Sequence, residues 1–502
     1  MSKMTLGMRW SCVLVPFSLF VVLCPPLVTA NPTASSAEVE RVVREALKPS
    51  ALQSNLQHLT DEIGGRVPGT PAMEAAIAWA QDAFRAAGGE NVHAEEFQIA
   101  QSWAESETRF SVEEPVKLNL HAVSVAWSPP LRPLRHVNIV DVKDGTADDF
   151  LRAGNVAGCI LLVHGKVIHT WDDLNEEYAR VPPIIERALR GKAAAIAWIA
   201  ERDHNLLYRH TDTQTGQMEP IPQVIVAREE GLRIARLLAS GRQVYADLEI
   251  PNRVGGPLTT ANVVAEIRGS EHPEQFVVLG AHLDSWELGT GALDNGCNAA
   301  MVIDPLRAIH TSGVRPERSI RFVLFSGEEE GLLGSEAYAH QHRQELDNAL
   351  AAVIFDSGSG RVTGFTLSGR TDLADATREL MAPLAPLGVT EITQDGDMGT
   401  DNFDFLLEGV PTLVANQDAA NYMPNYHAMS DTFDKVDLVN LRREVAEAAA
   451  MVVGIADARQ RFGTRQGRAQ IEKLLRDTHL EDTMKLNGIW AAWESGQRGR
   501  MR

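Results

Sequence analysis

Cysteine is scarce in this sequence, with four residues among 502. Cys12 and Cys24 fall within the first thirty residues, which leaves Cys159 and Cys297 for the rest of the chain. Two cysteines in so long a chain exclude the disulfide framework that stabilises small secreted domains. We expect both to be buried thiols, although the sequence alone leaves their pairing open.

Positive charge is also in short supply. Lys and Arg number 47 against 67 Asp and Glu, which gives a formal net charge of −20 at pH 7. Such a surface is unsuited to binding DNA or an anionic membrane. The same negative charge can concentrate cations near an acidic cleft.

Long apolar runs are absent after residue 30, so no later segment is predicted to span a bilayer. The first thirty residues are different. They have a basic start at Lys3 and Arg9, an apolar core over residues 12–23 and small residues at the end. This pattern predicts a secretory signal peptide that is cleaved after Ala30, so the protein is expected to be secreted or periplasmic.

The length and composition indicate two or three globular domains. Hydrophobic residues make up 44% of the chain, which is enough for large cores. Helical and strand patterns alternate, which is typical of an α/β fold. The predicted division is a signal peptide over residues 1–30, a main domain over 31–114 and 257–460, an inserted domain over 115–256, and a C-terminal helical tail over 461–502.

The predicted insert contains several apolar strands and no cluster of catalytic residues. Its helices are expected at residues 183–189 and 228–239. Its histidines lack the spacing of metal ligands, and we interpret them as surface or loop residues: His164, His169, His204 and His210. The arginine-rich end of the chain, residues 498–502, is expected to be frayed.

Three apolar strands of the main domain end on side chains that can bind a metal. Residues 276–282 end on His282, residues 319–325 lead to Glu328 and Glu329, and residues 351–355 are followed by Asp356. Ligands bind at the carboxyl edge of open α/β sheets, so these side chains should meet there. Each one alone has a simpler interpretation as a loop, capping or solvated residue, but their coincidence at successive strand ends favours a metal site.

Two further residues enlarge this predicted site. Asp294 starts a helix after a glycine-rich loop, and His427 follows another strand. Two imidazoles and three carboxylates suit Zn²⁺ and are too many for one open zinc site, so we predict two metals that share Asp294. Glu328 is then spare and can serve as general base, while Asp284 can accept the second ring N–H of His282.

These residues resemble the co-catalytic zinc exopeptidases, a family that includes zinc aminopeptidases and glutamate carboxypeptidases. The resemblance covers nearly the whole chain after the signal peptide. It is carried by the motifs His282-Leu283-Asp284-Ser285-Trp286, Asp294-Asn295-Gly296, Ser326-Gly327-Glu328-Glu329, Asp356 and His427 with Asp431-Thr432.

The resemblance implies a set of roles. One zinc would be held by His282, Asp294 and Asp356, and a second by Asp294, Glu329 and His427. Glu328 would be the catalytic base and Asp284 a supporting residue. Thr400, Asp401 and Tyr426 resemble residues of the pocket wall, although Asp401 can also be interpreted as a helix cap.

The implied fold is an α/β/α zinc exopeptidase domain with a mixed sheet and an inserted domain similar to the protease-associated type. The sequence departs from the family at Cys297-Asn298 and Asp304-Pro305, which puts the packing behind the site in question, since Pro305 should kink or restart its helix.

The expected substrates are short peptides. Nucleic acid is not an expected partner, nor is a membrane after signal cleavage, and the sequence leaves a homodimer open.

The predicted function is hydrolysis of short, unblocked peptides or dipeptides. One alternative is an aminopeptidase that releases N-terminal residues from longer peptides. Another is a receptor-like binding protein without activity on the same fold, which the complete set of ligands and base argues against. A glutaminyl cyclase would lack the insert, so the sequence argues against that alternative as well.

Overall fold

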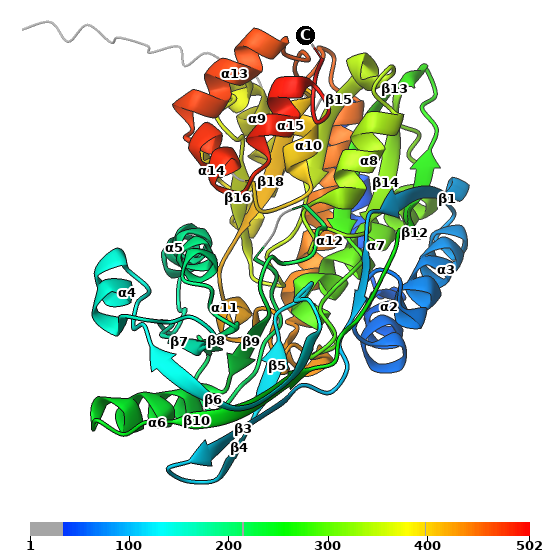
Figure 1. Ribbon diagram of the computed structural model, residues 1–502. Coiled ribbons are helices and arrows are strands. Elements are labelled where there is room, and N and C mark those ends of the chain that lie inside the picture. The colour runs from blue at the N-terminus through cyan, green and yellow to red at the C-terminus, as the bar shows by residue number, and fades with distance from the viewer. Residues whose placement is uncertain (1–33, 213–214, 397, 502) are drawn as a thin grey trace, which may run out of the picture.

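Two eight-stranded sheets organise the computed structural model, which describes residues 34–212, 215–396 and 398–501 (Figure 1). The predicted signal peptide, residues 1–30, lies outside these residues. Among the residues that the structure describes, no helix is both long and apolar enough to cross a membrane.

The first sheet, which we call the main sheet, has four parallel strands at its centre. Antiparallel pairings flank this centre, so the sheet is mixed, as the sequence predicts. The strands lie in the order β1 (Glu90–Ile99), β12 (Leu258–Ile267), β14 (Arg318–Phe325), β13 (His272–His282), β15 (Ala349–Ile354), β18 (Thr412–Gln417), β16 (Val362–Thr366) and β17 (Glu391–Thr393).

The central strand β13 is buried on both faces, which explains its uninterrupted apolar sequence. Val277, Leu279 and Ala281 point into one core, and Phe276 and Val278 point into the core on the opposite face. This alternation follows from the two-residue period of a strand. A sheet that is covered on both sides leaves its strand ends as the place where polar side chains can gather.

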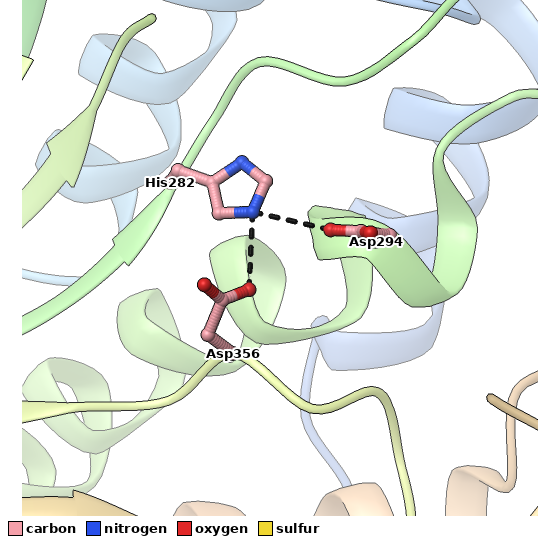
Figure 2. A group of neighbouring side chains, drawn as sticks. All are labelled: His282, Asp294 and Asp356. Atoms are coloured by element: carbon pink, nitrogen blue, oxygen red, sulfur yellow. Dashed lines mark hydrogen bonds and ion pairs between the residues drawn. The ribbon is translucent and has the colours of Figure 1, made fainter. Parts of the chain in front are cut away.

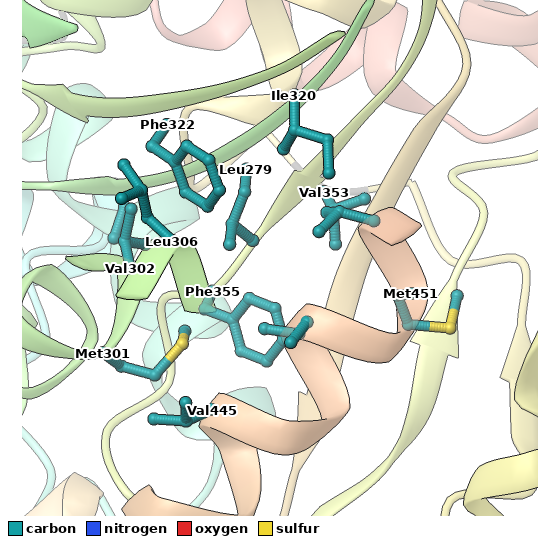
Figure 3. Packing of buried hydrophobic residues seen from close by; sticks show 14 of the residues in the cluster. Leu279, Met301, Val302, Leu306, Ile320, Phe322, Val353, Phe355, Val445 and Met451 are labelled. Atoms are coloured by element: carbon teal, nitrogen blue, oxygen red, sulfur yellow. The ribbon is translucent and has the colours of Figure 1, made fainter. Parts of the chain in front are cut away.

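Helices cover both faces of the main sheet and give the predicted α/β/α layers. The helix α3 begins where the sequence favours it, because the hydroxyl of Thr70 accepts the N–H of Met73 and Pro71 occupies the first turn. Figure 3 shows the larger core, in which Leu279, Phe322 and Phe355 contact helical side chains. One face is covered by α1 (Ala34–Ala46), α3 (Pro71–Ala86), α7 (Cys297–Ser312) and α12 (Leu438–Ala456), and the other by α8 (Leu333–Gln341) and α10 (Asn402–Leu407).

The second sheet lies below the main sheet in Figure 1 and has its own cores on both faces. All of its strands except β3 fall within the predicted insert, residues 115–256, whose boundaries remain a prediction. The helices α4 (Ala147–Ala153) and α6 (Arg228–Ala239) accompany it. Its strands lie in the order β4 (Leu118–Leu120), β3 (Arg109–Glu114), β10 (Tyr245–Ile250), β6 (Leu131–Asp141), β7 (Ile160–Val163), β8 (Ala195–Ile199), β9 (Gln223–Val226) and β5 (Ala122–Ser124).

One helix of the insert is much longer than the sequence analysis expected. The prediction of residues 183–189 is wrong at its start, because α5 extends over Trp171–Arg190 and contains both Pro182 and Pro183. Its N-terminus is fixed by a reciprocal pair of hydrogen bonds between Thr170 and Asp173. The additional turns carry Tyr178, whose hydroxyl lies 2.8 Å from that of Tyr426 in the main domain.

Residues 498–500 are packed rather than frayed, so the expectation is wrong for this part of the C-terminal end. After α13 (Arg468–Asp477), α14 (Leu480–Leu486) and α15 (Trp490–Ser495), the buried guanidinium of Arg498 donates to both carboxylate oxygens of Asp404 on α10, each at 2.8 Å. A bidentate charged pair of this kind fixes orientation as well as position.

The residues that depart from the family pattern are accommodated without a break. The helix α7 includes Pro305, and Asn298 donates hydrogen bonds to the side chain of Asn295 and to the carbonyl of Gly358. The thiols of Cys159 and Cys297 are free, and Cys297 is buried as expected, whereas Cys159 is partly exposed.

Candidate metal centre

The carboxyl edge of the parallel strands brings the predicted ligands together. His282 is the last residue of β13, which pairs in parallel with β14 and β15. The segment after β14 carries Glu328 and Glu329, and Asp356 follows β15 by two residues. Parallel strands end at the same edge of a sheet, so the chain direction alone places these side chains on one side.

Two groups of three side chains are close enough to hold a metal ion each. His282, Asp294 and Asp356 form the first group, and Asp294, Glu329 and His427 form the second. In the first group the Nε2 atom of His282 lies 3.2 Å from Asp294 Oδ1 and 3.1 Å from Asp356 Oδ1 (Figure 2). In the second group His427 Nε2 lies 3.2 Å from Asp294 Oδ2 and 2.9 Å from Glu329 Oε2.

Asp294 belongs to both groups and offers a different oxygen to each. Its main chain is held by Asp431, whose carboxylate accepts the N–H of Leu293 at 2.6 Å and that of Asp294 at 3.1 Å. Gly291 permits the tight loop that precedes it, with φ of +58° and a neighbour, Ser285, only 2.2 Å from the place of a Cβ. Asp431 and the tight loop at Gly291 therefore fix the main chain that leads to Asp294.

His427 lies in a loop and has a left-handed backbone with φ of +58°. The inserted domain holds this loop through a β-bridge between Tyr208 and Ala428. The N–H of Arg209 donates to the carbonyl of His427 at 2.9 Å, and the N–H of Met429 donates to Leu207 at 3.0 Å. Contacts from the insert thus set the position of one predicted metal ligand.

Asp284 supports the site differently from the prediction. The Nδ1 atom of His282 lies 3.0 Å from the main-chain carbonyl of Asp284 and 3.7 Å from its carboxylate, so the carbonyl is the acceptor of the ring N–H. The carboxylate accepts the main-chain N–H groups of Glu328 and Glu329 at 3.3 and 3.2 Å. Asp284 therefore orients the histidine and the two glutamates at once.

Arg66 also organises the site, although the sequence analysis did not single it out. Its side chain is fully buried and donates to the carbonyls of Leu283 at 2.6 Å, Thr290 at 2.8 Å and Gly291 at 2.9 Å. A guanidinium has five donors in a fixed plane, which lets it join several chain segments. Its sequence neighbours, Gly64-Gly65 and Pro68-Gly69, are typical of a turn and do not indicate this role.

Negative charge is crowded in this centre. Burial raises the pKa of Asp356 to about 6 and that of Glu329 to about 7, and it raises the pKa of Glu328 well above its usual range. Burial alone would lower the pKa of His427, but the nearby Glu329 and Asp294 outweigh it and raise this pKa to about 9. Such a group of acids favours the binding of cations.

The donor set fits zinc. Ligand atoms about 2.0–2.2 Å from a tetrahedral zinc ion lie roughly 3.3–3.6 Å from one another, close to the separations within each group. Imidazole nitrogen and carboxylate oxygen are both ordinary zinc ligands. The Oε1 atom of Glu329 has no hydrogen-bond partner within the described part of the chain. A metal ion could therefore bind this oxygen without breaking a hydrogen bond.

Glu328 stands apart from both groups. Its Oε2 atom lies 3.9 Å from His282 Nε2, and its side chain keeps 11% of its surface exposed. It therefore borders the centre without being one of the close ligand atoms. The space beside Asp294, Glu329 and His427 is small, with a cavity volume of about 10 Å³, which corresponds to roughly one water molecule.

Aromatic side chains from the insert complete the wall of the centre. The hydroxyl of Tyr178 lies 2.8 Å from that of Tyr426, and His210 stacks on both Tyr178 and His427 with ring centroids 5.0 and 5.6 Å apart. His210 lies in a loop, as expected from the sequence, but its ring packs against the centre, which the sequence did not indicate. The sequence signal that could have located Tyr178 is the capping pair at Thr170, because it places Tyr178 within the helix α5.

The three residues expected in the pocket wall are all buried or half-buried near the centre. Thr400 and Asp401 precede α10 and are buried, and Tyr426 contacts the insert as described above. The alternative that Asp401 caps its helix is wrong, because its side chain makes no capping hydrogen bond.

Comparison with known proteins gives consistent results. Residues 262–453 match the model of Peptidase family M28, and this range contains all five residues of the two groups and Glu328. Carboxypeptidase Q of Mus musculus is 28% identical over 407 residues, which cover 80% of this chain and 84% of that protein. The predicted resemblance to exopeptidases of this kind is therefore confirmed.

Two solved structures share the fold. A peptidase M28 precursor from Shewanella amazonensis SB2B has a TM-score of 0.76 and 24% identity, over 86% of this chain and 99% of that chain. A zinc aminopeptidase from Bacillus subtilis has a TM-score of 0.62 and 19% identity, over 82% of this chain and 94% of that chain. The α/β fold with a mixed sheet is shared along most of the length of each.

Proposed function

The chain contains a peptidase family M28 domain over residues 262–453, and we propose that this domain is a di-zinc exopeptidase acting on short peptides with free ends. The observation that carries the proposal is the position of Asp294. One of its oxygens lies 3.2 Å from His282 Nε2 and the other lies 3.2 Å from His427 Nε2. A carboxylate whose two oxygens face different imidazoles is placed to serve two metal ions at once.

Each zinc ion would have three protein ligands in this proposal. His282, Asp294 and Asp356 would hold one ion, and Asp294, Glu329 and His427 the other. When bound, zinc supplies Lewis-acid polarisation of the scissile carbonyl and makes water more acidic. Three protein ligands leave a coordination position open, which is typical of catalytic rather than structural zinc.

Glu328 is the proposed general base. Its carboxylate borders the ligand groups and retains some exposure, so it can reach a water molecule at the centre. It would take a proton from that water as the water attacks the carbonyl, and then give the proton to the nitrogen of the leaving amine. Burial raises the pKa of Glu328, which helps its carboxyl group to hold the proton between the two transfers.

The enclosed geometry supports short substrates. The insert contacts the loop of His427 through Tyr178, Tyr208 and His210, so the second sheet closes one side of the centre. A folded chain cannot pass through such a space. Carboxypeptidase Q is a relative over 80% of this chain, which agrees with an exopeptidase but does not define which end of the peptide is attacked.

Product analysis tests this function. We expect hydrolysis of a free dipeptide, slower hydrolysis of its N-acetylated form, and no internal cleavage of an unstructured polypeptide. Release of successive N-terminal residues from the polypeptide would instead favour the aminopeptidase alternative. Absence of any hydrolysis by zinc-loaded protein would favour a receptor-like protein, and full activity after exhaustive chelation would contradict the metal mechanism.

We also propose that the protein is exported by residues 1–30 and acts outside the cytoplasm. The support is the sequence pattern around Lys3, Arg9 and Ala30. Mass spectrometry of exported protein should find Asn31 at the N-terminus, and retention of residues 1–30 would contradict the proposal. Short peptides remain the proposed partners, with no nucleic acid and no membrane after cleavage.

A further inference from the structure

Two buried acids lie on α12, on the core side of the loop that follows Asp356. Glu444 and Glu447 are 0% and 1% exposed. Acidic side chains are almost never fully buried unless they have a partner. The positive charges of Arg361 and Arg443 act on Glu447, whereas Glu444 has no ion-pair partner in the described part of the chain. The burial of Glu444 therefore requires another explanation.

The side-chain amide of Gln417, at the end of β18, connects Glu444 to the loop that follows Asp356. The Nε2 atom of Gln417 donates to the carbonyl of Gly358 at 3.0 Å and to Oε1 of Glu444 at 3.2 Å. The same carbonyl accepts the side-chain amide of Asn298 on α7 at 3.1 Å. Two amide groups therefore hold this loop from the side of the core.

Two buried oxygen atoms of this arrangement lack a hydrogen-bond donor. Oε2 of Glu444 and Oε1 of Gln417 have no hydrogen-bond partner among the described residues. The amide cannot be turned over, because its oxygen would then face the carbonyls of Gly358 and Gly360. Buried polar atoms without a partner are costly. One proton on Oε2 of Glu444 satisfies both atoms, because the resulting O–H can donate to the amide oxygen.

We propose that Glu444 is a neutral carboxylic acid that forms a ring of two hydrogen bonds with the amide of Gln417 and thereby positions Asp356. In one bond the amide N–H donates to Oε1 of Glu444. In the other, the O–H at Oε2 donates to Oε1 of Gln417. Glu444 is a positioning residue, since it acts on Asp356 through Gln417 and Gly358. The consequence for zinc rests on the metal centre proposed above.

The surroundings of Glu444 favour its neutral form. Burial raises the pKa of Glu444 well above its usual range, and the neighbouring acids Glu447 and Asp437 raise it further. On the side of α7 it faces Cys297, a buried thiol whose own pKa is raised by burial and by Glu444. None of these groups supplies the positive charge that an ionised carboxylate in the core would require.

The proton on Glu444 matters for the metal centre because of its position behind a ligand. Loss of the proton removes the second hydrogen bond of the ring, so Gln417 holds the carbonyl of Gly358 less firmly. Asp356 lies two residues before this carbonyl. The preceding residue, Phe355, belongs to the same core as Val445, which follows Glu444 on α12 (Figure 3). The segment that carries Asp356 is therefore attached to α12 by apolar packing and through the ring.

Unfolding of the zinc-loaded protein by denaturant at several pH values tests the protonation. Glu444→Gln keeps the shape and both hydrogen bonds, because its amide can donate to Gln417 and accept from it, but it has no titrating proton. A group whose pKa is raised on folding stabilises most below its unfolded pKa and loses that contribution as pH rises towards its folded pKa.

The unfolding constant of the wild type, divided by that of Glu444→Gln, should therefore rise with pH by up to about tenfold per pH unit between about pH 5 and 8. Glu379→Gln, an exposed acid on α9 (Ala374–Met381), is the control, and the corresponding ratio for this variant should stay constant. A constant ratio for Glu444→Gln would overturn the neutral acid.

Zinc retention against a chelator tests the positioning role. Glu444→Leu is similar in size and can make neither hydrogen bond, so its zinc affinity should be about tenfold lower, whereas Glu444→Gln should match the wild type. If Glu444→Leu does not fold, Gln417→Met, which removes the amide, takes its place. Equal affinities in all variants would overturn the positioning role.

Wild-type protein that binds no zinc would overturn the positioning role together with the proposed metal centre. Neither measurement uses peptide hydrolysis, so a failure of the proposed exopeptidase activity would be seen separately, in the dipeptide assay.

Discussion

The two sheets contribute to the catalytic centre in different ways. In the main sheet, His282 ends a strand, and Glu329 and Asp356 follow the ends of its neighbours. The insert instead contributes Tyr178 from the middle of a helix and His210 from a loop. The positions of His282, Glu329 and Asp356 therefore follow from chain direction within one sheet, whereas the position of His427 depends on how the two sheets pack together.

The largest expected effect concerns the main sheet. Glu328→Gln should lower kcat by about 10² to 10⁴-fold, because the amide cannot accept the proton of the attacking water. The variant should still bind zinc fully, since Glu328 belongs to neither ligand group. Steady-state kinetics and metal analysis of the purified variant are the measurements.

Glu329→Gln is the matched comparison, because it changes the adjacent residue in the same way. This variant should lose zinc as well as activity, since Glu329 Oε2 is in one ligand group. Equal loss of zinc from both variants would contradict the division between base and ligand.

A smaller effect concerns the junction between the sheets. The buried guanidinium of Arg209 forms ion pairs with Glu105 and Glu287, which come from segments on either side of the insert. Arg209→Met removes the ion-pair partner of both carboxylates and should lower the free energy of unfolding by about 3 kcal/mol. Denaturant unfolding measures this change. The exposed Arg242→Met is the control, and a change no larger than that of the control would show that the junction contributes little.

The smallest effect concerns the aromatic wall. Tyr178→Phe removes the hydrogen bond to Tyr426 and leaves the ring in place. The loss of one neutral hydrogen bond should lower kcat/KM about two- to tenfold, because the loop of His427 is held less firmly. Tyr245→Phe, whose hydroxyl contacts Gln243 in the insert, is the control. An unchanged kcat/KM in Tyr178→Phe would mean that this hydrogen bond does not position the loop.

The sequence predicted the main sheet well because its signals are local. Apolar strands such as residues 276–282 are followed directly by polar ligands, and the structure brings His282, Asp294 and Asp356 together. Asp284 was predicted to support His282, but the acceptor is its carbonyl rather than its carboxylate. The identity of a residue does not show whether its main-chain carbonyl or its side chain will accept a hydrogen bond.

The sequence predicted less where distant segments pack together. The predicted helix began at Pro183, whereas the capping pair of Thr170 and Asp173 sets the start of α5 twelve residues earlier. The arginine-rich end suggested fraying, but Asp404, ninety-four residues away, buries Arg498. Both errors arise because a partner that is remote in sequence overrides a local preference.

Zinc content tests the central claim most directly. The wild-type protein, loaded with zinc and freed of excess metal, should contain two zinc ions per chain. Asp294→Ala removes both bridging oxygens and should reduce the content to well below one, while circular dichroism verifies that the fold is retained. Two zinc ions in the folded Asp294→Ala variant, or none in the wild type, would contradict a shared carboxylate between two metals.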